Sequence, residues 1–132
     1  MNAGMTRTLT VGALFIIIFG AGFWLSRSGK PYNGLLFTIH KLVGLGALVF
    51  LGITVSRIGR TQGLQPGQIA AISVAGLSFL VTIVTGGLVS ASTTLPAFVT
   101  VIHRLFPYLT VLSTAGTLYL LMSVSREIVS AS

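Results

Sequence analysis

The chain of 132 residues is 53% hydrophobic and only 7% charged, a composition that lies outside the range of soluble globular domains and indicates a protein of the lipid bilayer. Its eight Lys and Arg residues outnumber a single acidic residue, Glu127, but in a membrane protein this excess reports orientation and lipid contact, and no basic stripe indicates nucleic-acid binding. The sequence has no cysteine, which excludes disulfides, thiolate metal sites, iron–sulfur clusters and covalent haem attachment.

Four apolar stretches, at residues 9–25, 35–55, 69–89 and 97–124, are long enough for helices that cross a bilayer core, which takes about 20 residues. We expect the first stretch to be retained, because its apolar run exceeds the usual core of a signal peptide. Short connections with turn residues follow at 26–34, 60–68 and 90–96. The sequence therefore predicts an all-α fold, a single transmembrane domain over residues 1–132 that forms an up-down-up-down four-helix bundle.

The basic residues that flank these stretches divide unevenly between the two sides of the membrane. The side of the termini carries Arg7, Arg57, Arg60 and Arg126, whereas the opposite side carries Arg27 and Lys30. The positive-inside tendency then predicts both termini in the cytoplasm, and we expect a multi-pass protein of a bacterial inner membrane.

A short motif occurs twice, as Ile-His-Lys-Leu at residues 39–42 and Ile-His-Arg-Leu at residues 102–105. Its histidines, His40 and His103, are the only two in the chain. Each lies about six residues, or about 9 Å, inside its predicted helix. Because the second and fourth helices run in the same direction, both imidazoles are predicted at the same depth on the non-cytoplasmic side.

Two histidines at one depth on diagonal helices suggest a shared ligand. The diagonal of such a bundle is roughly 13 Å, too far for direct contact, but a haem iron with two axial histidines fits it. Lys41 and Arg104 directly follow the histidines and are placed to extend outward and neutralise the haem propionates. We therefore predict one bis-histidine haem b, with iron ligated by His40 and His103.

A macrocycle also needs space at this depth, and small or bent residues supply it. The positions predicted to border the haem are Gly20 and Gly22 in the first helix, Gly86 and Gly87 in the third, Gly44 below His40, and Pro107 below His103. Pro107 should also kink the fourth helix. The second ring nitrogens should donate to Thr38, Thr82, Thr85, Thr100 or backbone carbonyls.

The repeated motif is also compatible with duplication of a two-helix unit. The histidines are 63 residues apart, and Gly22 and Gly86 are separated by nearly the same interval. Parallel repeats of this kind give an internal pseudo-symmetry.

With one histidine on each of two parallel helices, followed by a basic residue and small or proline positions, the chain resembles the small integral-membrane b-type cytochromes built on four-helix bundles. The resemblance implies one-electron transfer with a quinone, flavoprotein or other redox subunit. Because the bundle is small and its loops are short, we expect it to act within a larger complex or a homo-oligomer. Many members of that class hold two haems with four histidines, whereas this chain has two histidines. The chain therefore departs from that pattern, and its two histidines leave one haem near one face of the membrane.

Other functions fit the same residues. Each histidine would suffice to ligate the magnesium of its own chlorophyll, or both would bond neighbouring helices in a cofactor-free assembly subunit. A coupled transporter fits less well, since the predicted spans hold no carboxylate. The lone Glu127 lies beyond the last span, and no nucleophile or phosphate loop suggests an independent enzyme, so we expect an electron carrier.

Overall fold

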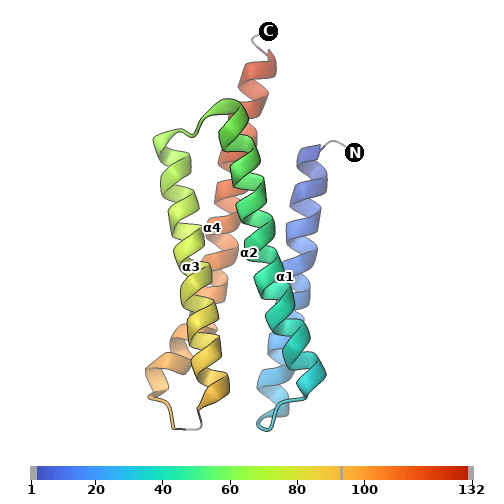
Figure 1. Ribbon diagram of the computed structural model, residues 1–132, viewed down its shortest axis with the longest axis vertical. Coiled ribbons are helices and arrows are strands. Elements are labelled where there is room, and N and C mark those ends of the chain that lie inside the picture. Colours follow the sequence, from blue (N-terminus) through green and yellow to red (C-terminus); the bar gives the residue numbers. More distant parts are fainter. Residues whose placement is uncertain (1–2, 93, 131–132) are drawn as a thin grey trace. The chain divides into compact units, whose positions relative to one another are not determined.

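The computed structural model describes residues 3–92 and 94–130, and the side chains of residues 6, 7, 9–60, 63–92 and 94–123. Helices are the only regular secondary structure in this part of the chain, with α1 at Ala3–Ser28, α2 at Gly34–Gln62, α3 at Pro66–Ala91 and α4 at Ala97–Ser130 (Figure 1). Each helix contains a segment long and apolar enough to cross a membrane: Leu9–Ser28, Gly34–Arg60, Pro66–Ala91 and Ala97–Ser123. The prediction of an all-α membrane protein is confirmed.

The helices extend further than the apolar stretches suggested. The connections shrink to residues 29–33, 63–65 and 92–96, because polar residues at the ends of the apolar runs continue the helices. Gly29 and Gly63 follow α1 and α2 with φ angles of 69° and 71°, the left-handed conformation in which glycine commonly ends a helix. Of the residues used to predict orientation, Arg126 lies outside the described side chains, as does Glu127.

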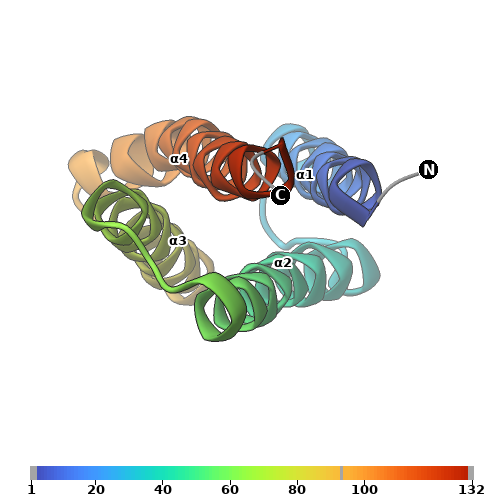
Figure 2. The same ribbon diagram turned by 90° about the horizontal axis from the view of Figure 1, so that it is seen from above.

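The chain divides into two compact units, Met1–Ile53 and Thr54–Ser132. The first contains the hairpin of α1 and the beginning of α2, and the second contains the end of α2 and the hairpin of α3 and α4. Within each hairpin the helices are antiparallel neighbours (Figures 1 and 2). The single domain over residues 1–132 stays a prediction.

In the α1–α2 hairpin the buried residues follow a helical period. They are Val11, Phe15, Ala21 and Leu25 on α1, and Ala47 and Leu51 on α2. Large apolar side chains elsewhere remain exposed, with Ile16 at 75% and Leu35 at 73%, as expected for helices that face hydrocarbon.

The α3–α4 hairpin packs through small and hydroxyl side chains. Thr82 and Thr110 place their hydroxyl oxygens 3.3 Å apart across the two helices. Gln68, near the start of α3, is buried and donates to the carbonyl of Leu120 on α4 at 3.1 Å. Small residues and interhelical hydrogen bonds are typical of helix packing in membranes. Pro107 lies inside α4, whose first turns run at an angle to the rest of the helix (Figure 1).

Candidate functional site

His40 is fixed between the two helices of the first hairpin. The residue is half-buried, and its Nδ1 lies 3.0 Å from the carbonyl oxygen of Ile18 on α1. Because a carbonyl only accepts, Nδ1 carries the hydrogen and the lone pair of the neutral ring is on Nε2. The ring lies against Gly22, where an added Cβ would come within 3.0 Å of its Cε1 atom.

His103 is fixed in the same way in the second hairpin. Its Nδ1 lies 3.1 Å from the carbonyl oxygen of Thr82 on α3, and its ring lies against Gly86. A Cβ on Gly86 would come within 2.7 Å of the imidazole Cε1, so the ring occupies the space that any larger residue would need. The lone pair of the neutral ring is again on Nε2.

The two arrangements correspond residue by residue, and we call each an imidazole clamp. The first clamp consists of the His40 ring, Gly22 and the Ile18 carbonyl; the second consists of the His103 ring, Gly86 and the Thr82 carbonyl. In both, the carbonyl residue lies one helical turn before the glycine, so the two share a face of their helix. The sequence repeat is therefore also a repeat of local geometry.

The second clamp has one additional contact. Thr85 Oγ1 lies 3.3 Å from His103 Nδ1, and the same hydroxyl donates to the carbonyl of Val81 at 2.7 Å. Since its hydrogen is directed to Val81, the hydroxyl oxygen can accept from the histidine. The residue directly before Gly22 is Ala21, so the first clamp has no hydroxyl at the corresponding position.

The predicted partners of the second ring nitrogens are partly confirmed. For His103 they are the Thr85 hydroxyl and the Thr82 main-chain carbonyl, whereas the Thr82 hydroxyl donates to Ser78. Thr38 instead donates to Gly34 within its own helix, and the partner of His40 is a carbonyl that sequence reasoning did not identify.

The remaining predicted site residues differ in their surroundings. Gly22 and Gly86 receive the imidazole rings themselves, a role that differs from the predicted one of making space for a macrocycle. A Cβ added at Gly20, Gly44 or Gly87 would meet no described atom within 4 Å. Their placement beside a haem stays a prediction, as does that of the half-buried Pro107.

The two basic residues that follow the histidines are both exposed. The Lys41 ammonium lies 4.1 Å from the ring centroid of Phe37, one turn nearer the start of α2, so the side chain extends toward the start of its helix. This direction agrees with the predicted outward extension. A role for Lys41 and Arg104 beside propionates stays a prediction.

The described residues hold no group of three or more His, Cys, Asp or Glu side chains that could bind a metal ion. A haem does not depend on such a group, since the porphyrin supplies four ligands to the iron and the protein only the axial ones. Comparisons of the chain with models of protein families, with curated proteins and with solved structures give no match.

Proposed function

We propose that this protein is a membrane b-type cytochrome that holds one haem b, with His40 and His103 as its axial ligands, and transfers single electrons. Its partner would be a quinone or another redox protein, in a larger complex or a homo-oligomer. The proposal is supported chiefly by one observation, the occurrence of the same imidazole clamp in both hairpins.

The chemistry of the clamps suits metal ligation. Histidines that bind metals commonly donate the other ring N–H to a carbonyl, which fixes the tautomer and the ring orientation. Both clamps do this through Nδ1 and leave the lone pair of the neutral ring on Nε2. Both rings also lie against a glycine, so no Cβ displaces them. These residues fit a bis-histidine haem.

A haem, when bound, supplies a one-electron couple at its iron. Two histidine ligands occupy both axial positions, so the proposed activity is electron transfer without binding of oxygen or peroxide. Lys41 and Arg104 would lie beside the propionates, and their positive charge would favour the reduced iron. The proposed location is a bacterial inner membrane, and the distribution of flanking basic residues supports cytoplasmic termini.

A cofactor-free structural subunit is the second candidate. The bonds from His40 to Ile18 and from His103 to Thr82 link the two helices of each hairpin, and such bonds stabilise membrane helices without any cofactor.

Chlorophyll binding also has an observation in its favour, because each clamp is complete within its own hairpin and a pigment needs a single axial ligand.

An optical spectrum of the purified protein, oxidised and then reduced with dithionite, separates these functions. We expect a sharp Soret band and split α and β bands on reduction, as for a low-spin b-type haem. A long-wavelength absorption of chlorophyll would instead support the pigment. A colourless protein that remains colourless after incubation with haemin would contradict both and favour the structural subunit.

A further inference from the structure

The loop end of the α1–α2 hairpin carries a cluster of cations and aromatic rings. Three basic residues, Arg27, Lys30 and Lys41, lie within fifteen positions of one another and are all exposed. The only acidic residue of the chain is Glu127, far away in the sequence. The hairpin therefore holds no carboxylate to balance these charges.

Each of these cations lies over an aromatic ring. The Arg27 guanidinium is 5.1 Å from the ring centroid of Phe23, and the Lys30 ammonium is 5.9 Å from that of Tyr32. Such contacts restrict where the charged groups lie without neutralising them. The cluster thus keeps its net positive charge, which would attract an anion.

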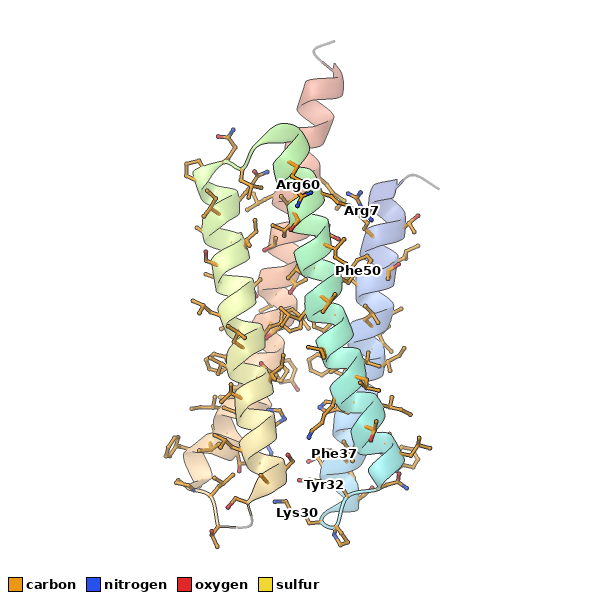
Figure 3. All side chains as sticks on the ribbon, in the orientation of Figure 1. Arg7, Lys30, Tyr32, Phe37, Phe50 and Arg60 are labelled. Carbon is orange, nitrogen blue, oxygen red and sulfur yellow. The ribbon has the colours of Figure 1, made fainter. Side chains whose placement is uncertain are left out.

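The rings themselves are connected. Tyr32 and Phe37 stack with centroids 5.7 Å apart and planes inclined by 21°, and the Lys41 ammonium lies over Phe37 on α2. Figure 3 shows Lys30, Tyr32 and Phe37 gathered where α1 and α2 are joined. The connection between the helices is thereby an ordered basic surface, which we call the loop-end site: Arg27, Lys30, Lys41, Phe23, Tyr32 and Phe37.

Exposed apolar side chains continue this surface along the helices. Trp24 is 67% exposed and Phe23 is 63% exposed, and both lie in the membrane-spanning segment of α1 next to Arg27. A ligand that carries an anionic group at one end and hydrocarbon at the other would contact both kinds of side chain. Aromatic and basic residues of this kind concentrate at the bilayer interface, where lipid phosphates lie.

We propose that the loop-end site binds the phosphate headgroup of an anionic phospholipid, with its acyl chains along Phe23 and Trp24. Free phosphate also offers an anionic group, but it has no hydrocarbon for the exposed rings. An acidic protein segment would have to displace lipid from these apolar side chains. The proposal does not depend on the haem, although Lys41 is shared with the proposed propionate contacts.

The test uses native mass spectrometry of delipidated, full-length protein titrated with dioctanoyl phosphatidylglycerol or dioctanoyl phosphatidylcholine. We expect the wild type to bind phosphatidylglycerol in preference to phosphatidylcholine. The double variant Arg27→Gln/Lys30→Gln should bind phosphatidylglycerol about 25-fold more weakly, because each basic residue near an anionic surface contributes about fivefold to the affinity. Lys41 is left in place so that any haem remains comparable. The matched control, Arg57→Gln/Arg60→Gln, removes two cations from the other end of α2 and should bind as the wild type does.

A second variant shows whether the weaker binding reflects lost charge or misfolding of the glutamine variant. Arg27→Lys/Lys30→Arg keeps both charges and should retain the preference for phosphatidylglycerol. Equal binding by the wild type and the glutamine variant would overturn the proposal. So would competition by inorganic phosphate at the same concentration as the lipid, which would assign the site to free phosphate, or tighter binding of a polyglutamate peptide, which would assign it to an acidic protein.

Discussion

The two hairpins share the setting of their histidines and differ in almost everything around it. Both hold an imidazole through a main-chain carbonyl and a glycine on the preceding helix. Around the first clamp the loop end is basic and aromatic, whereas the second hairpin packs through the hydroxyls of Thr82 and Thr110 and the buried amide of Gln68. Because this setting recurs in such different surroundings, we infer that the orientation of the imidazole ring is what it serves to fix. A fixed orientation of the ring also fixes the position of Nε2, which carries the lone pair.

The difference also suggests unequal roles for the two histidines. His103 Nδ1 has the Thr85 hydroxyl as a second acceptor, and a Cβ added at Gly86 would lie 2.7 Å from the His103 ring, compared with 3.0 Å for a Cβ at Gly22 and the His40 ring. Acceptors on the second ring nitrogen raise the basicity of a ligating histidine. We therefore expect His103 to be the more firmly oriented and more strongly donating ligand.

The largest expected effect comes from removing either ring. His40→Ala or His103→Ala should abolish the low-spin, six-coordinate haem spectrum, because two axial nitrogens are needed, while the chain still inserts in the membrane. Optical spectra of the purified variants measure this. The adjacent substitutions Ile39→Leu and Ile102→Leu are the controls. An unchanged six-coordinate spectrum in either alanine variant would remove that histidine from the proposed ligands.

The next effect concerns the glycines that receive the rings. Gly86→Ala should weaken haem binding by about tenfold or more and Gly22→Ala by less, because inserting a methyl into a packed contact costs about 1–3 kcal/mol and the contact at Gly86 is tighter. Titration of the apoprotein with haemin measures the affinity.

Gly12→Ala in α1 and Gly76→Ala in α3 are matched controls, since a Cβ at either position meets no described atom within 4 Å. If these controls lose as much affinity as the clamp variants, the loss reflects helix stability and the clamps have no special role.

A smaller effect is expected from the charges beside the histidines. Lys41→Gln combined with Arg104→Gln should lower the haem midpoint potential by on the order of 50 mV, or roughly sevenfold in the one-electron equilibrium, because positive charge favours the reduced iron. Potentiometric titration measures the shift, with Arg57→Gln/Arg60→Gln as the control. A potential equal to that of the wild type would argue against contact with the propionates.

The smallest effect tests the asymmetry itself. Thr85→Ala removes the second acceptor of His103 and should raise the midpoint potential by on the order of 20 mV, about twofold in equilibrium, because the ring donates less to the iron. Ala21→Thr should shift it in the opposite direction. Ser73→Ala, whose hydroxyl bonds Ile69 within α3, is the control. Shifts of the same sign in Thr85→Ala and Ala21→Thr would contradict the assigned role.

Sequence reasoning identified the four helices because the apolar runs are long and their ends carry turn residues. It also singled out His40, His103, Gly22 and Gly86. It could not supply the contacts among them, since a main-chain carbonyl such as that of Ile18 has no signature in the residue type. The contact between the Lys41 ammonium and the Phe37 ring was also not predicted, because the type of residue 37 does not distinguish it from the other apolar residues of its span.

The stoichiometry of haemin binding to the apoprotein tests most directly whether the two histidines hold one haem. We predict that the wild type saturates at one haem per chain with a low-spin spectrum. We also predict that neither single alanine variant of His40 or His103 forms that low-spin species. Saturation at two haems per chain, with half of the signal kept in each variant, would show that each clamp binds its own cofactor and would contradict the proposal.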